Sequence, residues 1–336
     1  MTQFSGELFA HSFDSADDPL VAVAEKPDPQ TIDRTRPVVV TGAAGLVGTR
    51  TCSVLADRGW KVRAVVRDTA KAAEKLGHLR IEIRSGDIRD VESMQSALRS
   101  AGALVHLAAI AIEKKGESYA DTNTKATEIL LDACRIEAVS RIVYMSQNGA
   151  DSTSRFPFLR SKGMAQDAVV ASNTRWTVLK PSVIFGPDDE FVNVLARLVR
   201  LSPIVYLLPG GGTARFQPIA VGDVAQAIAK CLEDESTVRR TFSLGGPVPL
   251  TLRQMTERIL VGVPIALLRP VIALTQRVLP HPPVTTGLLD LLELDNVVPS
   301  NDLVSELGID PVPFAPEELL YLRQITFSSA VNSLLR

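Results

Sequence analysis

A short apolar strand that runs into three evenly spaced glycines constrains the fold of this chain more than any other feature. Val38 to Val40 precede Gly42, Gly45 and Gly48. Glycine at the first place lets the chain turn sharply, at the second leaves bare backbone for a pyrophosphate, and at the third lets the next helix pack closely on the sheet. The same spacing also suits a strand-turn-helix unit without a ligand. We expect a phosphate-binding turn at a helix N-terminus. It comprises Gly42, Ala44, Gly45, Leu46, Val47 and Gly48.

Apolar, β-branched runs alternate with helix-like segments between residues 37 and 180. The runs lie at 38–40, 62–66, 80–83, 104–107, 141–145 and 176–179, and the helix-like segments at 47–57, 91–99, 119–136 and 161–171. Strands that are apolar on both faces are typical of a parallel sheet covered by helices on both sides. We therefore expect an α/β fold with a doubly wound, mostly parallel Rossmann sheet that binds its ligand at the carboxyl ends of the strands.

Glycine and proline become more frequent after Lys180, which predicts a change of architecture there. We expect a flexible N-terminal extension at 1–36, a Rossmann domain at 37–180, and a smaller, mixed, largely helical C-terminal lobe at 181–336. Two strands, at 216–221 and 241–244, and a helix at 224–232 are expected to follow the lobe's first elements and return to the first domain. Gln217 and Asp223 are expected to join the two lobes, with an N-cap of the 224–232 helix as the alternative for Asp223.

Charge and composition exclude several classes of protein. The chain has 36 basic and 38 acidic residues and a net charge of −2, which argues against nucleic-acid binding. Its three cysteines and four histidines show no ligand spacing, so we predict neither a metal site nor disulfides, and a cytoplasmic location. Prolines and arginines interrupt the apolar stretch 259–279, which is too broken to span a membrane. Segment 259–295 is expected to be a buried helix of the lobe or to contact a protein partner or a membrane surface.

The residue that ends the second predicted strand indicates which dinucleotide binds. An acid about 20 residues beyond the glycine turn holds the ribose 2′-hydroxyl of NAD, whereas an arginine accommodates the 2′-phosphate of NADP. Arg67 occupies this place, which favours NADP(H). Asp68 follows it directly and keeps NAD(H) as the alternative. A solvated arginine at a strand end is the reading without a ligand.

Two further strand ends carry residues suited to a nucleotide. Asp87 and Ile88 follow the third strand, where a carboxylate can accept the adenine amino group and an apolar side chain can cover the ring. Ala108 and Ala109 follow the fourth strand and leave room for a ribose. An ordinary turn and close packing of a helix on the sheet explain the same residues without a ligand.

Four motifs in a fixed order carry a family resemblance. They are FLRSK at 158–162, KPSVIFGP at 180–187, FQPIAVGDV at 216–224 and LGGP at 244–247. With the glycine turn, they resemble the atypical and extended short-chain dehydrogenases/reductases, also described as NAD-dependent epimerase/dehydratase-like proteins. Within that family, the resemblance is closest to the group that contains the nucleotide-binding accessory subunit of respiratory complex I. It implies a bound nicotinamide dinucleotide and a variable lobe over its nicotinamide end.

The resemblance also assigns roles to residues beyond the glycine turn. Family enzymes use a serine to position the substrate oxygen, a tyrosine as the proton donor, and a lysine that lowers the pKa of the tyrosine. Ser146 and Lys162 match the serine and the lysine, but Phe158 occupies the tyrosine position and has no proton to give. The implied cofactor contacts are Asn123, Lys162, Pro181, Val183 and Ile184.

Two functions follow from these residues. The preferred one is an NADP(H)-dependent oxidoreductase for a small or lipid-like carbonyl compound such as a quinone or an isoprenoid. Its proton would then come from Lys162, a water, Tyr119 or Tyr144, of which Tyr144 is the poorest candidate because it lies within a predicted core strand. The alternative is a non-catalytic nucleotide-binding accessory or assembly protein of a respiratory or quinone-pathway complex.

Overall fold

The computed structural model describes residues 32–114, 116–201, 209–261, 292 and 294–325. Most of the predicted N-terminal extension and most of segment 259–295 therefore lie outside the described residues. Among the residues that are described, no helix has the length and apolar character needed to cross a bilayer.

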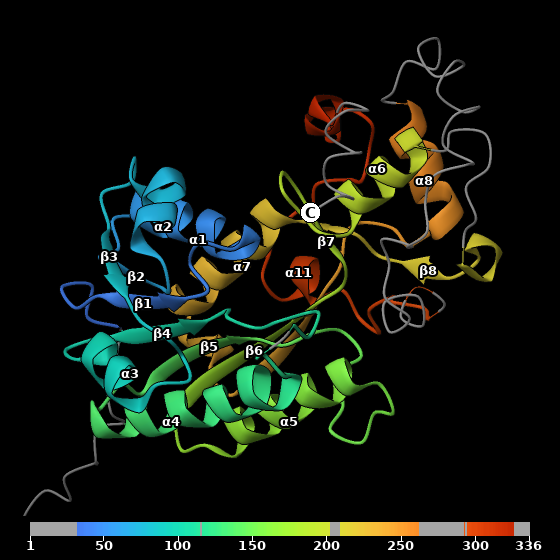
Figure 1. Ribbon diagram of the computed structural model, residues 1–336. Helices are drawn as coiled ribbons and strands as arrows, with labels where there is room; N and C mark the ends of the chain where they lie inside the picture. The colour runs from blue at the N-terminus through green and yellow to red at the C-terminus, as the bar shows by residue number, and fades with distance from the viewer. Residues whose placement is uncertain (1–31, 115, 202–208, 262–291, 293, 326–336) are drawn as a thin grey trace, which may run out of the picture. The chain divides into compact units, whose positions relative to one another are not determined.

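A seven-stranded parallel sheet forms the centre of residues 38–244 (Figure 1). The strand order is β10-β6-β5-β4-β1-β2-β3, and every neighbouring pair is parallel. The strands are β1 (Val38–Thr41), β2 (Val62–Val66), β3 (Glu82–Ser85), β4 (Ala103–His106), β5 (Arg141–Met145), β6 (Arg175–Pro181) and β10 (Arg240–Leu244). This order confirms the predicted doubly wound fold. The direction of winding reverses between β1 and β4, which opens a crevice at their carboxyl ends.

Helices cover both faces of this sheet, as Figure 1 shows. Helices α1 (Leu46–Asp57), α2 (Thr69–Leu76) and α7 (Val221–Glu233) lie on one face, and α3 (Val91–Leu98), α4 (Ala126–Ile136) and α5 (Pro157–Ala171) lie on the other. Side chains of a strand alternate between faces. Val38 and Val40 accordingly pack in the core with α1 and α7, whereas Val39 packs in the core with α3 and α4.

Two small sheets and several helices form a second hydrophobic core. The strand β7 (Ile184–Phe185) pairs with β9 (Ile219–Ala220), and β8 (Arg215–Phe216) pairs with β11 (Leu250–Thr251). They are joined by α6 (Val192–Leu201), α8 (Leu252–Val261) and 3-10 turns at Pro209–Gly212 and Leu320–Gln324, whereas α11 (Asp302–Ser305) packs beside β10 in the core of the large sheet. Phe185, Phe216, Met255 and Phe314 are buried together in this core.

Several predicted elements differ from the structure. The strand expected at 216–221 is divided into β8 and β9, since Pro218 has no N–H to donate and Gln217 instead bonds Gly246 and Val298 through its side chain. The helix expected at 224–232 begins earlier, at Val221. Asp223 therefore lies inside α7 and is not its N-cap; its carboxylate accepts the backbone N–H of Val312 at 2.8 Å. Helix α5 begins at Pro157 rather than at residue 161, because proline suits the first helical turn.

Candidate functional site

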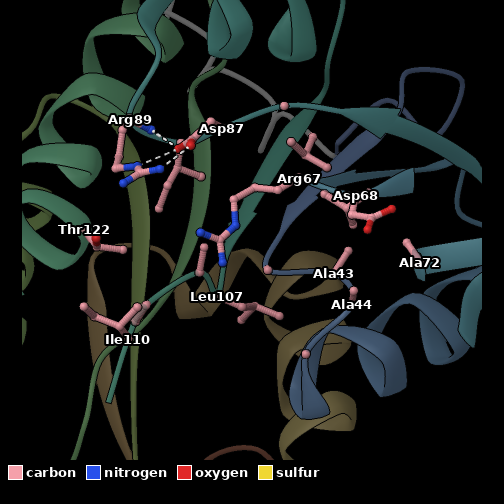
Figure 2. A pocket seen from close by; sticks show the side chains of 18 of the residues that line it. Ala43, Ala44, Arg67, Asp68, Ala72, Asp87, Arg89, Leu107, Ile110 and Thr122 are labelled. Atoms are coloured by element: carbon pink, nitrogen blue, oxygen red, sulfur yellow. Dashed lines mark hydrogen bonds and ion pairs between the residues drawn. The ribbon is translucent and has the colours of Figure 1, made fainter. Parts of the chain in front are cut away.

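A cavity of about 590 Å³ lies at the carboxyl ends of β1 to β4 (Figure 2). Its walls include eight of the residues that the sequence nominates for cofactor binding. These are Gly42, Ala44, Gly45, Arg67, Asp87, Ile88, Ala108 and Ala109. Residues from four strand ends that are far apart in the sequence therefore meet around one space. Leu46, Val47 and Gly48 do not line it but form the first turn of α1, which begins at the cavity.

Close backbone contacts require glycine at two positions of the turn, Gly42 and Gly48. Gly42 has a φ of +68°, and a Cβ added to it would lie 2.8 Å from the backbone nitrogen of Ala108. A Cβ on Gly48 would lie 2.1 Å from the carbonyl oxygen of Gly42. Gly45 is the N-cap of α1, and no side chain caps this helix end. The first N–H groups of a helix have no partner within it, so this turn fits the pyrophosphate of a dinucleotide.

Arg67 and Asp68 both line the cavity, but their side chains have different partners. The Arg67 side chain is 65% exposed and forms an ion pair with Glu117, which also lines the cavity. Asp68 instead caps α2, because its carboxylate accepts the backbone N–H of Lys71 at 3.0 Å. Figure 2 shows the Asp68 carboxylate turned away from the Arg67 guanidinium, towards Ala72 of α2. The Asp68 carboxylate is thus engaged by α2, and the Arg67 guanidinium is paired with Glu117 from the loop after β4.

Asp87 is held in place as a charged hydrogen-bond acceptor. Its two carboxylate oxygens accept the Arg89 guanidinium at 3.0 and 2.6 Å. These hydrogen bonds hold the pKa of Asp87 below its usual range, so the group is ionised at neutral pH. An ionised carboxylate only accepts hydrogen bonds, which suits the exocyclic amino group of adenine, and Ile88 follows it as an apolar wall.

A single π-helical turn, Ala120–Lys125, brings two polar side chains to this region. Thr122 is 8% exposed, lines the cavity, and its hydroxyl has no hydrogen-bond partner within the described part of the chain. Asn123 does not line the cavity. Its side chain bonds both backbone groups of Ile110 and the hydroxyl of Ser161, at 2.9 to 3.1 Å. Asn123 thus fixes the loop after β4 against α5, and Ile110 of that loop forms part of the cavity wall.

Sequence reasoning missed five residues of the cavity wall that carry polar or charged side chains. They are Lys71, Lys75, Arg89, Glu117 and Thr122. Lys71 and Lys75 are four residues apart on α2, a spacing that places them on one helix face and was available in the sequence. The π-turn could not be predicted from the sequence, because no pattern in residues 119–125 distinguishes it from an ordinary helix.

Lys162 and Ser146 face inward rather than towards the cavity. The Lys162 side chain is buried and donates to the backbone oxygen of Met145 at 2.7 Å, with its nitrogen 4.7 Å from the ring centre of Tyr144. Burial lowers the pKa of Lys162 to about 7. The Ser146 hydroxyl, also buried, donates to Gln166 of α5 at 2.8 Å. In this structure both side chains bond the protein itself.

Phe158 lies in the first turn of α5 and packs against Tyr119, with 5.8 Å between ring centres. The Tyr119 hydroxyl donates to the backbone oxygen of Ala111 at 2.9 Å, and burial together with Glu113 raises the pKa of this phenol. The Tyr144 hydroxyl is buried without a partner among the described residues, and burial raises its pKa as well. Of the two tyrosines, only Tyr119 lies beside position 158.

The predicted nicotinamide loop follows the end of β6. Pro181 is the last residue of β6, Val183 lies in the two-residue link between the strands, and Ile184 begins β7. None of the three lines the cavity. The backbone oxygen of Pro181 accepts the N–H of Asn148 at 2.9 Å, and Ser182 donates to Asn296 at 2.6 Å. The loop is therefore fixed both to the end of β5 and to the C-terminal lobe.

Comparisons with known proteins agree with this geometry. Residues 38–245 match the model of the NAD dependent epimerase/dehydratase family. The "NADH dehydrogenase [ubiquinone] 1 alpha subcomplex subunit 9, mitochondrial" of Arabidopsis thaliana is 30% identical over 65% of this chain, and the match spans 56% of that protein's length. The ceramide reductase of Caulobacter vibrioides is 28% identical over 60% of this chain and 65% of its own.

Two solved structures show the same fold at low identity. A dTDP-glucose 4,6-dehydratase from Streptomyces venezuelae with NAD bound has a TM-score of 0.67 at 19% identity, and the match covers 86% of this chain and 97% of that one. A UDP-glucose 4-epimerase of Thermus thermophilus in complex with NAD has a TM-score of 0.66 at 21% identity, covering 86% and 100%. The chain belongs to the NAD dependent epimerase/dehydratase family, within the extended short-chain dehydrogenases/reductases.

Proposed function

We propose that this chain binds NADP(H) in the cavity at the ends of β1 to β4. The observation that carries the proposal is the backbone cradle at Gly42 and Ala108, which a side chain would fill, in one cavity with Arg67 and Asp87. The pyrophosphate would lie against Gly45 and the first turn of α1. Adenine would lie at Asp87 and Ile88, where the unpartnered Thr122 hydroxyl offers a further hydrogen bond.

The charges at the end of β2 support NADP(H) over NAD(H). Arg67, Lys71 and Lys75 line the cavity at this end. Of the two acids beside them, Asp68 is engaged as the cap of α2 and Glu117 is paired with Arg67. A guanidinium can hold a phosphate through two parallel hydrogen bonds. The 2′-hydroxyl of NAD, by contrast, requires a carboxylate that is available to accept it.

The residues at the positions that carry proton transfer in related enzymes support a protein that keeps its nucleotide bound without turning it over. Phe158 has no proton to exchange, Ser146 bonds Gln166, and Lys162 bonds Met145. We therefore assign the nucleotide the role of a retained ligand, which stabilises the folded chain by mass action. An accessory function of this kind agrees with the similarity to the mitochondrial NADH dehydrogenase subunit.

A second function, reduction of an apolar carbonyl compound, has its own support. Two relatives are named as reductases of lipid-like compounds, the ceramide reductase and the 2-alkyl-3-oxoalkanoate reductase of Stenotrophomonas maltophilia, and the second name specifies an oxo group. The bound dinucleotide would supply the hydride, and the protein would have to supply a proton. Tyr119 is the hydroxyl that lies beside Phe158, and the Lys162 amine titrates near neutral pH.

Calorimetric titration with NADPH and NADH tests the binding, and the Arg67→Asp variant tests the preference for NADPH over NADH. We expect the wild type to bind NADPH more tightly than NADH, and Arg67→Asp to weaken NADPH about 10-fold to 100-fold while changing NADH far less. Equal losses of affinity for both nucleotides would refute the 2′-phosphate assignment.

NADPH oxidation with a panel of carbonyl compounds and quinones separates the two roles, since turnover that Lys162→Ala abolishes would favour the reductase.

A further inference from the structure

Glu117 is the acid that pairs with Arg67 in this structure. The Arg67 guanidinium and the Glu117 carboxylate form an ion pair, and both residues line the cavity. Glu117 is not near Arg67 in the sequence; it lies on the loop that follows β4, fifty residues later. The ion pair therefore connects the end of β2 to this loop at the place proposed for the 2′-phosphate.

Glu117 stands at the end of a hydrogen-bonded backbone turn and is less exposed than Arg67. Glu117 and Lys114 exchange two backbone hydrogen bonds, of 2.9 and 3.3 Å, around a turn in which Gly116 has a φ of +84°. The Glu117 side chain is 20% exposed, against 65% for Arg67. The carboxylate is thus presented from a formed turn, and the longer arginine side chain reaches it.

The other acids of the cavity wall are already engaged elsewhere. Asp68 caps α2 through the N–H of Lys71, and Asp87 is bonded to Arg89. Glu117 is the acid that remains for Arg67 among the described residues of the wall. A 2′-phosphate carries about −1.5 to −2 charges at pH 7 and would approach the same guanidinium. It would therefore compete with Glu117 for Arg67.

We propose that Glu117 sets the preference between NADP(H) and NAD(H) by competing with the 2′-phosphate for Arg67. This inference rests on the proposed function. NADPH has to displace the carboxylate from Arg67, whereas NADH has no 2′-phosphate and leaves the ion pair intact. Exposed ion pairs contribute little to free energy, and charge-assisted hydrogen bonds to a phosphate contribute more. The phosphate therefore displaces Glu117 from Arg67, but the binding free energy of NADPH is smaller than it would be without Glu117. Glu117 thus lowers NADPH affinity while leaving that of NADH unchanged.

The test measures the dissociation constants of NADPH, NADH and 2′,5′-ADP for the wild type and Glu117→Gln. We expect Glu117→Gln to bind NADPH and 2′,5′-ADP about threefold to tenfold more tightly and to change NADH by less than twofold. Glu113→Gln is the matched control, because it removes the same charge from the same loop at a side chain that does not line the cavity. It should leave all three constants within twofold.

A double-mutant cycle ties the effect to Arg67. In an Arg67→Gln background, Glu117→Gln should no longer improve NADPH binding beyond the effect of Glu113→Gln. Two results would overturn the inference alone, provided that the wild type binds both nucleotides. One is an equal gain in NADPH affinity from Glu117→Gln with and without Arg67. The other is a ratio of NADPH to NADH affinity that Glu117→Gln leaves unchanged. A wild type that binds none of the three probes would overturn the proposed function and the inference with it.

Discussion

The ring of Phe158 packs against the ring of Tyr119, with centres 5.8 Å apart and planes inclined by 55°. Phe158 comes from the first turn of α5, and Tyr119 directly precedes the π-turn that leads into α4. A hydroxyl is therefore present beside the position where the family places its tyrosine, but it comes from a different helix. It already donates to the backbone oxygen of Ala111, so it has a structural role without any substrate.

Phe158→Tyr should create or strengthen carbonyl reduction. The new phenol would lie one helical turn before Lys162, the spacing that family enzymes use, and general acid catalysis typically contributes about 10²-fold to 10⁴-fold. We expect NADPH oxidation with the best carbonyl substrate to rise at least tenfold. Phe156→Tyr is the control, since it makes the same chemical change at the N-cap of α5 and away from that spacing. Equal rates for the two variants would show that proton donation at position 158 is not the obstacle.

Replacing Lys162 should change how stability depends on pH. An unfolded lysine titrates near 10.4, whereas burial lowers the pKa of Lys162 in the folded protein to about 7. Below pH 7 the amine is protonated in both states, so the folded state bears the full desolvation cost. Between pH 7 and about 10 only the unfolded state holds the proton, so this cost fades as pH rises. Lys162→Met should therefore gain stability relative to the wild type, on the order of a few kcal/mol at pH 6.5, and less at pH 9.5.

Urea unfolding of both proteins at pH 6.5, 8 and 9.5 measures this difference. Lys125→Met serves as the control, because the Lys125 side chain is 71% exposed and should show no such trend. A stability difference between wild type and Lys162→Met that stays constant over the three pH values would contradict the burial argument.

Thr122→Val should separate stability from nucleotide affinity. Removing a buried hydroxyl that has no partner should stabilise the nucleotide-free protein by about 1 kcal/mol. Loss of the hydrogen bond that this hydroxyl would make to the nucleotide should lower the affinity for NADPH about 5-fold to 10-fold. Thr51→Val is matched to it, because the Thr51 hydroxyl in α1 is also buried without a partner in the described chain but does not line the cavity. That variant should gain stability and keep its affinity. Thermal unfolding with and without NADPH reports both quantities, and unchanged NADPH affinity in Thr122→Val would remove Thr122 from the site.

Gly48→Ala should destabilise the protein, although alanine is the better helix former. The added Cβ would lie 2.1 Å from the carbonyl oxygen of Gly42, so the backbone has to shift, at a cost of about 1–3 kcal/mol. Gly222→Ala, in α7, is the control. Its Cβ would meet only Arg50 atoms at 3.9 and 4.0 Å, and the change should stabilise by roughly 0.5–1 kcal/mol. Urea denaturation compares them, and a Gly48→Ala variant as stable as the wild type would show that the turn can relax.

The sheet and the glycine turn were predictable because local sequence determines them. Strands buried on both faces consist of apolar runs, such as residues 38–40, and a positive φ at the end of a strand requires a residue like Gly42. The division of β8 from β9 at Pro218 was also signalled, since proline cannot donate to a ladder, but the apolar residues on either side masked it.

Side-chain pairing across distant elements could not be predicted in this way. The Arg67–Glu117 ion pair and the Ser146–Gln166 bond join residues that only the tertiary fold brings together. The orientation of Lys162 towards Met145 likewise depends on how α5 packs on β5. Sequence patterns therefore located the cavity, whereas the charges available to a ligand within it required the structure.

Helix α7 and strand β10 follow β7 to β9 in the chain, yet β10 pairs with β6 and α7 packs on α1. An expression fragment that stops at residue 180 would leave β6 as an unpaired edge and strip α1 of its apolar cover, and both defects promote aggregation. The smallest fragment suited to crystallising the nucleotide cavity alone must therefore run at least to Leu244.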